Sequence, residues 1–265
     1  MKQRWFTALS ILWLASMVML ALTAPIITSA NPFQPVSDPL QSPSEYPPLG
    51  TDALGRDFYT RIAYGARLSI SIPLLATLLT VIIGTALSLT ASSLGGLSDR
   101  IILALSNAAL AIPGLLLAML LVAGFGPGIP TVIIAVGLGG IPIFVRLSRS
   151  IFLGIWRSGY VDAAYALGSK QSRIAFFHVL PNAAPQLTSL ATTYFAWAFM
   201  GATTLTFLGF TGDPSLPEWG AMLNTGRLHL MQAPSLAVVP GLLISLTILS
   251  IHFLGEHFSD IRSIR

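Results

Sequence analysis

The chain has 265 residues, of which 54% are hydrophobic and 9% charged, with a mean hydropathy of +0.76. A soluble domain of this size would have roughly a quarter of its residues charged, so the composition excludes a large soluble domain and indicates an all-α polytopic membrane protein. The net charge is +4, but no Lys/Arg-rich run or zinc-finger spacing occurs, which argues against nucleic acid as a partner. The absence of cysteine excludes disulfides, thiolate metal sites and a cysteine nucleophile.

Six segments of the sequence are apolar for long enough to form transmembrane helices. A helix needs about 20 mostly apolar residues to cross the hydrocarbon core of a bilayer. The six are Trp5–Ile27, Ser69–Ala91, Ile101–Gly124, Ile129–Val145, Leu187–Leu208 and Ser235–Leu254. The fourth is short and rich in small residues, which allow close helix approach in lipid, so we expect it to pack inside a bundle.

The first of these segments could belong to a signal peptide, since Lys2 and Arg4 precede its apolar run. However, the run is longer than the roughly 7–15 residues of a signal-peptide core, and no A-x-A cleavage site follows it. We therefore expect the first helix to be retained as a membrane anchor.

The distribution of cations predicts the orientation in the membrane, because cytosolic loops carry an excess of Lys and Arg. If the N-terminus is cytosolic, the cations facing the cytosol are Lys2, Arg4, Arg100, Arg146, Arg149, Arg157, Lys170, Arg173, Arg262 and Arg265. Those remaining outside are Arg56, Arg61, Arg67 and Arg227. This imbalance predicts that both termini and the loop between the fourth and fifth spans are cytosolic.

The predicted spans divide the chain into three parts. These are residues 1–28 with the tail and first span, an external loop at 29–68, and a membrane core at 69–265 with a cytosolic loop at about 146–186.

The external loop changes character along its length. Residues 31–48 are rich in Pro and Ser and cannot form regular helix. From Asp57 to Arg67 the pattern becomes helical, and Asp57 and Arg61 have the spacing of a favourable i,i+4 ion pair. We expect a short helix lying at the outer membrane surface, with a solvated loop helix as the alternative.

The predicted spans contain almost no ionisable side chains, and His252, near the inner end of the last span, is the exception. Ion- and proton-coupled carriers usually need intramembrane carboxylates, histidines or cations as relays. Sodium sites built from backbone carbonyls and hydroxyls remain an alternative. Energy for uphill transport would then enter from outside the bilayer, and the cytosolic loop is the natural point of entry.

That cytosolic loop has the pattern of a helical hairpin. Ser158 can cap a helix start with its hydroxyl, and Gly168 stands where a helix would end, because glycine adopts left-handed geometry freely. A second helical pattern follows to Leu180, and Pro181 suits the first turn of the next helix. The loop is expected to dock on a cytosolic partner, with an ordinary connecting loop as the alternative.

Each half of the hairpin has distinguishable faces. The alanine pair at 163–164 gives the first helix a surface smooth enough to sit in a cleft of another protein. In the second half, Ile174 and Phe177 are expected on one side, while Lys170 and Arg173 face water.

At these residues the sequence resembles a known family. Asp162-Ala-Ala-x-x-x-Gly168 followed by His178-x-Leu-Pro-Asn182 resembles the EAA loop of ABC importer permeases, in particular the C-type subunit of the dipeptide/oligopeptide/nickel group. The further stretches that agree are Leu49-Gly-Thr-Asp-Ala-Leu-Gly-Arg-Asp57, Gly65-x-Arg67, Phe207-Leu-Gly209, Trp219-Gly220, Gly226-Arg227, Ala233-Pro234 and Pro240-Gly241. The resemblance covers nearly the whole chain in order and spacing.

The resemblance implies a type I ABC importer permease in the inner (plasma) membrane of a bacterial or archaeal cell. It implies a heterodimer with a B-type permease subunit, one or two ABC ATPase subunits seated on the EAA loops, and an extracytoplasmic solute-binding protein. ATP binding would close the ATPases, pull the coupling helices together and turn the permease from inward- to outward-facing. This chain has no G-x-x-x-x-G-K-[ST] loop, so ATP and Mg belong to the partners, no cofactor is expected here, and the chain is not an enzyme.

Residue roles also follow from the resemblance. The ATPase-coupling positions are Tyr160, Asp162, Ala163, Ala164, Gly168, Lys170, Arg173, His178 and Pro181. The external family motif comprises Gly50, Thr51, Asp52, Gly55, Arg56, Asp57 and Arg67. The expected solute is a dipeptide or oligopeptide, and the alternatives are nickel, another small solute, or an ion-coupled carrier in place of the importer.

The chain departs from the family pattern at several positions. Asp162 stands where the family has a glutamate, which keeps the charge but shortens the reach by one methylene. Ala104 and Asn107 replace an arginine and an aspartate, and Ala202 replaces an acidic residue. These losses remove charges that pair inside the usual permease, so either the partner subunit has changed to match or the substrate path is less polar.

A membrane enzyme is the rival from another class. Ser245 and His252 share one span, and no Gly-x-Ser-x-Gly sequence occurs, so a rhomboid-type serine protease is not indicated. His178 alone is expected to be an interfacial histidine and not a metal ligand.

Overall fold

The computed structural model describes the backbone of residues 2–263 and the side chains of residues 5–255. The side chains of Lys2, Arg4, Arg262 and Arg265, which the topology prediction counts as cytosolic, lie outside the described residues. Within the described part the chain is helical, and extended pairing is limited to the isolated bridges Pro35–Arg56 and Thr51–Asp57. The all-α prediction is confirmed.

The helices follow one another along the chain with short connections, apart from one long irregular segment after the first. They are α1 (Lys2–Ile27), α2 (Phe58–Leu94), α3 (Gly96–Leu110), α4 (Gly114–Phe125), α5 (Ile129–Trp156), α6 (Gly159–Ala166), α7 (Gln171–Ile174), the π-helix η1 (Ala175–Val179), α8 (Leu180–Phe207), α9 (Trp219–Gly226), the 3₁₀-helix η2 (Arg227–His229) and α10 (Ser235–Ser263).

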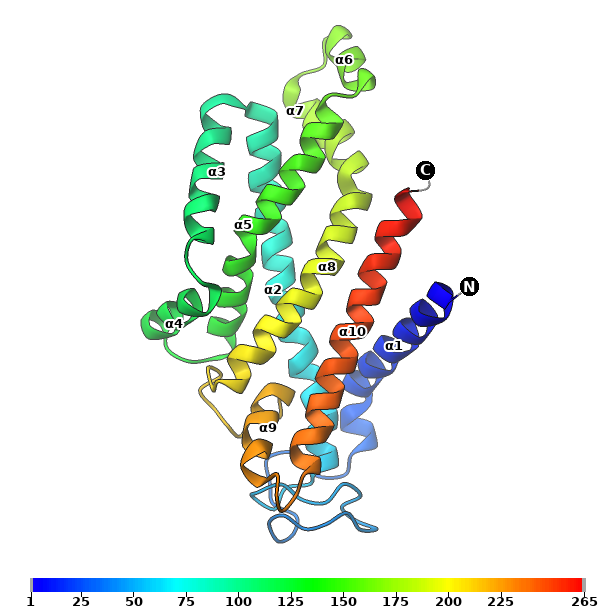
Figure 1. Ribbon diagram of the computed structural model, residues 1–265, viewed down its shortest axis with the longest axis vertical. Coiled ribbons are helices and arrows are strands. Elements are labelled where there is room, and N and C mark those ends of the chain that lie inside the picture. The colour runs from blue at the N-terminus through cyan, green and yellow to red at the C-terminus, as the bar shows by residue number, and fades with distance from the viewer. Residues whose placement is uncertain (1, 264–265) are drawn as a thin grey trace.

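The long helices run side by side along the longest axis of the molecule (Figure 1). α2 packs against α5 and α8, while α10 packs against α8 and α1. α6 forms one tip, and residues 28–57 cover the opposite end (Figure 1). α1 ends and α10 begins at the covered end, so both termini of the chain point away from it (Figure 1).

Four helices of the described chain are long and apolar enough to cross a membrane: Trp5–Ile27, Phe58–Leu94, Ile129–Trp156 and Ser235–Gly255. The bent pair α3 and α4 could supply a fifth. α8 has 28 residues but is less apolar, since several threonines and two prolines interrupt its hydrophobic residues. The predicted count of six spans is therefore not reached by length and hydropathy alone.

The third predicted span, Ile101–Gly124, is wrong as a single helix. α3 ends at Leu110, α4 begins at Gly114, and the two helices are bent by 90°. Pro113 explains the break, because proline lacks a backbone N–H and disfavours helical geometry at the residue before it. α4 therefore points sideways at one edge of the bundle, next to α5, instead of running along the long helices (Figure 1).

The short surface helix predicted at 57–67 is also wrong. These residues belong to the start of α2, which is one continuous helix of 37 residues. Phe58, Ile62 and Ala66 recur on one face and are buried in an apolar cluster with Trp219 of α9 and side chains of α10. Because this face packs inside the protein, no apolar stripe remains there to bind the membrane interface.

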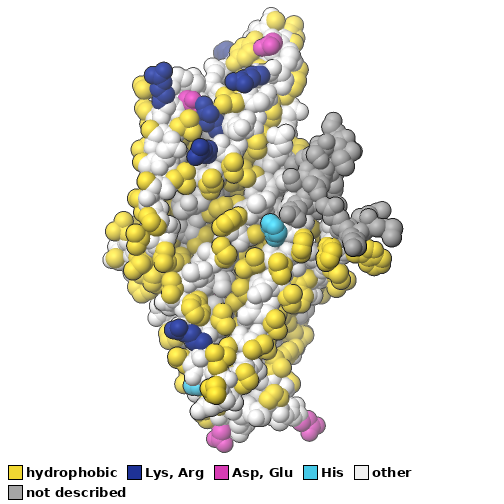
Figure 2. Space-filling view, viewed as in Figure 1, with side chains coloured by type: hydrophobic (Ala, Val, Ile, Leu, Met, Phe, Trp, Pro, Cys, Tyr) yellow, Lys and Arg dark blue, Asp and Glu magenta, His cyan; other side chains and the backbone are white. Residues whose placement is uncertain are grey.

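The other predicted spans extend beyond their limits at the end that carries α6. α5 continues past Val145 to Trp156, and α8 begins at Leu180 instead of Leu187. These extensions hold α6 beyond the end of α3 (Figure 1). In Figure 2 hydrophobic side chains cover the middle of the molecule, while most Lys and Arg side chains on this face gather toward the same end.

Candidate functional site

The hairpin between α5 and α8 comprises residues 158–179, and its first helix begins and ends where the sequence predicts. Ser158 is the N-cap residue of α6 with extended geometry (φ −83°, ψ 139°), but its hydroxyl makes no capping hydrogen bond. Gly168 adopts a positive φ of 80°, and the N–H of Ser169 donates to the carbonyl of Ala164 at 3.0 Å. The predicted glycine stop is confirmed, because this geometry closes the last turn of the helix.

The inner face of α6 is fixed to the membrane core. Val161 and Ala164 are buried in an apolar cluster that includes Phe152 of α5, Leu89 of α2 and Leu187 of α8. Ala164 therefore does not share an outer surface with Ala163, and the predicted alanine docking face is wrong. The cause is helical geometry, since residues three apart lie on one face and adjacent residues do not.

The outer face of the hairpin is apolar at its tip. Leu167 is 87% exposed, and Tyr160 and Tyr165 are 45% and 43% exposed. Exposed positions on the same short helix also include Asp162 and Ala163. These exposed apolar side chains thus lie on an element that extends beyond the end of α3 (Figure 1).

The second half of the hairpin is less regular than predicted. Only Gln171–Ile174 is α-helical, and η1 follows with π-helical hydrogen bonding before α8 begins. Ile174 is fully buried whereas Phe177 is 73% exposed, so the prediction that they share one side is wrong. The wider π-helical turn shifts the angular spacing of side chains. Pro181 lies in the first turn of α8, as predicted.

His178 is half-buried within η1, and its carbonyl accepts a hydrogen bond from the side-chain amide of Asn182 at 2.5 Å. Among the described residues, no group of three or more His, Cys, Asp or Glu side chains is placed to hold a metal ion.

Further contacts tie the hairpin to neighbouring helix ends. The side-chain amide of Gln171 donates to the carbonyl of Ser93 at the end of α2. The rings of Trp156 and Tyr165 lie 6.4 Å apart between α5 and α6. Movement of α6 would therefore be passed to α2 and α5 as well as to α8.

At the opposite end, the external family motif forms a buried ionic cluster. The carboxylate of Asp52 pairs with Arg56 at 2.7 Å and with Arg61 at 3.1 Å. Arg61 also donates to the carbonyls of Pro32 and Ser215, both at 2.9 Å. This cluster, named the external clamp below, joins residues 28–57 to the start of α2 and to the loop before α9.

The external clamp corrects the expected pairing of Asp57 with Arg61. Asp57 does not pair with Arg61; its carboxylate caps α2 by accepting from the N–H of Thr60 at 3.1 Å. Arg56 and Arg61 are 5% and 3% exposed, so neither is available for a contact with another protein. Asp52, in the loop itself, pairs with both Arg56 and Arg61, because the loop folds back onto the start of α2.

The other motif residues shape the loop around the external clamp. Gly50 and Gly55 have φ values of 77° and 74°, and a Cβ on either would lie 2.2 Å from a backbone carbonyl oxygen. The hydroxyl of Thr51 donates to the carbonyl of Asp38 at 2.6 Å. Of the external motif residues, Arg67 is the one that is exposed.

Two charged side chains near the external clamp are not in the predicted set. Glu218 is 2% exposed, and its carboxylate accepts from the hydroxyl of Ser69 at 2.9 Å and from the N–H of Ala221 at 2.8 Å. Glu218 thereby caps α9 and joins it to α2. In the sequence, an acidic residue directly before Trp219-Gly220 could have indicated this cap. In the same loop, hydrogen bonds from the hydroxyl and then the N–H of Ser215 hold the pKa of the Asp213 carboxyl below its usual range.

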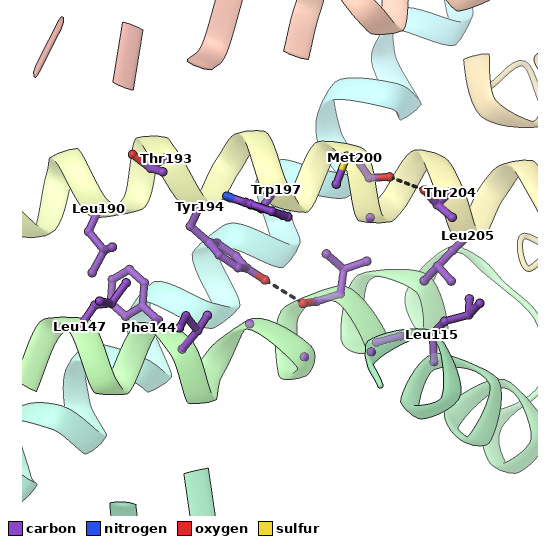
Figure 3. A pocket seen from close by; sticks show the side chains of 18 residues that line it. Leu115, Phe144, Leu147, Leu190, Thr193, Tyr194, Trp197, Met200, Thr204 and Leu205 are labelled. Carbon is purple, nitrogen blue, oxygen red and sulfur yellow. Dashed lines mark hydrogen bonds between the residues drawn. The ribbon is translucent and has the colours of Figure 1, made fainter. Parts of the chain in front are cut away.

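Between these two ends, a groove of about 530 Å³ opens between α4, α5 and α8 (Figure 3). Its lining contains no Asp, Glu, Lys, Arg or His side chain. Tyr194 reaches across from α8 and donates its hydroxyl proton to the carbonyl of Val136 at 2.8 Å (Figure 3). A Cβ at Gly140 would lie 1.9 Å from that hydroxyl oxygen. Glycine at this position of α5 therefore leaves the space that the ring of Tyr194 occupies.

Besides Asp162 on α6, the positions that depart from the family pattern lie near this groove and on α3. Ala202 of α8 is buried in an apolar cluster with Ile72 and Val132, and Ala104 and Asn107 are exposed on α3. Nearby, Asp99 of α3 forms an ion pair with Arg149 of α5.

A family model described as "Binding-protein-dependent transport system inner membrane component" matches residues 80–260. The chain belongs to this family of transport permeases. The match includes the hairpin and the groove.

Comparisons of the whole permease agree with this assignment. It is 36% identical to the dipeptide transport system permease protein DppC of Alkalihalophilus pseudofirmus, over 98% of this chain and 86% of that protein. It is 37% identical to the glutathione transport system permease protein GsiD of Pectobacterium atrosepticum, over 83% of this chain and 73% of that protein. The resemblance drawn from the EAA-like loop is confirmed, and the chain is a permease of a binding-protein-dependent ABC importer.

The fold also matches a solved permease. An inward-facing structure of the MetNI methionine ABC transporter superimposes with a TM-score of 0.62 at 18% identity, covering 77% of this chain and 96% of that chain. At this identity the likeness supports the type I permease fold alone.

Proposed function

We propose that the permease is the C-type subunit of a peptide importer, and that cytosolic ATPase subunits drive it by moving α6. The observation that carries this proposal is the two-sided hairpin. Its outer face exposes Leu167, while its inner face is packed through Val161 and Ala164 onto α2, α5 and α8. The name of the DppC relative supports a dipeptide as solute.

The packing defines how force would travel. α5 and α8 both contribute to the apolar cluster under α6, and both line the groove. α1 and α10 pack instead in the cluster next to the external clamp. A displacement of α6 would therefore shift α5 and α8, which line the groove, relative to α1 and α10. We further propose that the groove faces the B-type subunit.

The proposed topology has six crossings with both termini in the cytosol. α8 counts as the fifth crossing, because it runs beside α5 and α10 over most of their length (Figure 1). The broken pair α3 and α4 counts as the third. The hairpin then lies in the cytosol and residues 28–57 outside, where a solute-binding protein would contact exposed side chains such as Phe33, Tyr46 and Leu54.

Reconstitution tests this function directly. The permease, a B-type permease subunit and the ATPases would be placed in lipid vesicles with the binding protein, and uptake of labelled dipeptide and of Ni²⁺ would be measured with ATP and with a non-hydrolysable analogue. We expect dipeptide uptake that requires hydrolysis. Uptake of Ni²⁺ alone would replace the peptide assignment with the metal alternative, and nucleotide-independent accumulation would contradict an ATP-driven importer.

A further inference from the structure

The two halves of α5 are packed in different apolar clusters. In the outer half, toward the external clamp, Val132 and Ala135 lie in a cluster with Ile72 of α2 and Leu205 of α8. In the inner half, toward the hairpin, Phe152 lies in the cluster under α6. A displacement of α6 would therefore act on the inner half, while a separate set of contacts holds the outer half.

The helix between these halves is weakened by its residues. Residues 137–142 contain Gly137, Gly139, Gly140 and Pro142. Proline has no N–H to donate to the carbonyl four residues earlier, and glycine is among the least favourable residues in a helix interior. α2 and α8 run through the same two clusters, but between them neither helix has a glycine and a proline within two turns of each other.

Side chains from both neighbouring helices bond to carbonyls at this point of α5. The hydroxyl of Tyr194 donates to the carbonyl of Val136 at 2.8 Å (Figure 3). The hydroxyl of Thr80, which is fully buried on α2, donates to the carbonyl of Gly137 at 2.7 Å. Such bonds steady a transmembrane helix where proline and glycine weaken it.

Close packing explains two of the glycines. A Cβ at Gly137 would lie 2.3 Å from the side chain of Leu79, and a Cβ at Gly140 would overlap Tyr194. At Gly139, in contrast, a Cβ would meet nothing within 4 Å among the described residues. Packing within this chain does not exclude a side chain there, and the property that glycine supplies is backbone freedom.

We infer that α5 bends at residues 137–142 during transport, and that Tyr194 and Thr80 are positioning residues that hold it in the conformation described. This inference rests on the proposed function, because α6 supplies the displacement. A hinge is a small number of positions that absorb the backbone change. The inner half would follow α6 while the outer half stays in its own cluster.

Distances between paired spin labels test the bend in the complete transporter, reconstituted in vesicles with cysteine-free partner subunits. This chain has no cysteine, so introduced cysteines are its only labelling sites. One pair, Ser150→Cys with Leu249→Cys, joins the inner half of α5 to α10, and a second, Ile134→Cys with Leu242→Cys, joins the outer half to α10. When a non-hydrolysable ATP analogue binds, we expect the inner distance to shift and the outer distance to stay within experimental error. Equal shifts of both distances, or no shift of either, would overturn the hinge, while ATP-driven uptake would still support the proposed function.

Gly139→Ala tests whether backbone freedom is needed. Alanine stabilises a helix over glycine enough to change an equilibrium about fivefold. We expect dipeptide uptake to slow by about this factor, with an unchanged amount of inserted protein. Gly154→Ala is the matched control, because a Cβ there also meets nothing within 4 Å but lies on α5 outside the hinge. Equal slowing by both variants, or by neither, would contradict the hinge.

Thr80→Val tests the positioning role, because it removes the hydroxyl and keeps most of the shape. An average hydrogen bond between membrane helices is worth about threefold in an equilibrium. We expect the inner distances to redistribute about threefold away from the distance of the described structure, and Thr80→Ser to restore them. Thr77→Val is the matched control, because Thr77 is buried on α2 but donates to the carbonyl of Pro73 in its own helix. The same redistribution in Thr77→Val, or none in Thr80→Val, would overturn the positioning role. If wild type shows no ATP-driven uptake, the proposed function fails and the inference fails with it.

Discussion

Charged side chains are buried and paired at one end of the permease and, in the described part of the chain, exposed and unpaired on the hairpin at the other. In the external clamp, Asp52, Arg56 and Arg61 are buried and paired, and Arg61 also donates to backbone carbonyls. On the hairpin, Lys170 and Arg173 are exposed and have no ion pair within the described residues. Basic residues within sequence motifs can therefore hold a loop together in one place and remain exposed in another, and burial distinguishes the two cases.

The strongest test of this contrast is Asp52→Ala in the external clamp. The substitution leaves two buried guanidinium groups without their anion, and breaking a buried pair in this way costs about 3–5 kcal/mol. We expect poor accumulation of the protein and a lower thermal midpoint in detergent. Asp38→Ala is the matched control, because that carboxylate is exposed in the same loop, and its effect should stay within about 0.5 kcal/mol. Equal effects would mean that the external clamp does not stabilise the fold.

A second test uses glycines with the same backbone geometry at the two ends. An alanine at a positive φ costs about 1–2 kcal/mol at either place. At Gly50 its Cβ would also lie 2.2 Å from the carbonyl oxygen of Gln41, whereas nothing lies within 4 Å at Gly168. We expect Gly50→Ala to lower the free energy of unfolding by about 1–3 kcal/mol more than Gly168→Ala does, as measured by thermal unfolding of the purified protein. A larger loss at Gly168 would contradict the open surroundings of the hairpin.

The apolar tip provides a third test, with an effect on binding and not on folding. Leu167 is 87% exposed, so Leu167→Asp should leave the thermal midpoint within experimental error. Loss of a central apolar anchor weakens an interface by about 2 kcal/mol, or roughly 30-fold in affinity. Retention of the ATPase during purification, together with solute-stimulated hydrolysis, measures the change. If the Leu167→Asp variant retained the ATPase and stimulated hydrolysis as the wild type does, α6 would not be the docking element.

The smallest expected effect distinguishes a helix cap that is bonded from one that is not. The carboxylate of Asp57 accepts from the N–H of Thr60, whereas the hydroxyl of Ser158 makes no capping hydrogen bond. Asp57→Ala should therefore destabilise the protein by about 0.5–2 kcal/mol. Ser158→Ala should change stability by less than about 0.5 kcal/mol, and thermal unfolding of the two variants in parallel checks the difference.

Predictions that depended on local backbone preference were the accurate ones at the hairpin. Gly168 ends α6 because left-handed geometry is accessible to glycine, and Pro181 lies in the first turn of α8. The π-helix η1 was missed, since its apolar residues do not differ in composition from those of an α-helix. The break at Pro113 was visible in the sequence, but the apolar composition on both sides favoured a single span.

Predictions that depended on which surface a side chain meets were the inaccurate ones. Ala164 turned inward because α6 lies against α5 and α8, and 57–67 joined α2 because its apolar face meets α9 and α10. The groove and the role of Tyr194 required three helices to be placed relative to one another. No periodicity within one segment contains that information.

The amino-acid sequence by itself indicated an all-α membrane protein with a helical hairpin, because composition, spacing of apolar residues and a glycine stop are properties of the chain alone. Its motifs carried the resemblance to ABC importer permeases. Tertiary structure decided which charged side chains are buried in ion pairs and which are exposed. Asp52 lies near Arg61 only after the loop folds back onto α2. Lys170 and Arg173 form no ion pair within the described residues, because no acidic segment packs against them there. Charge pairing depends on distance in space, and distance in space is fixed by packing.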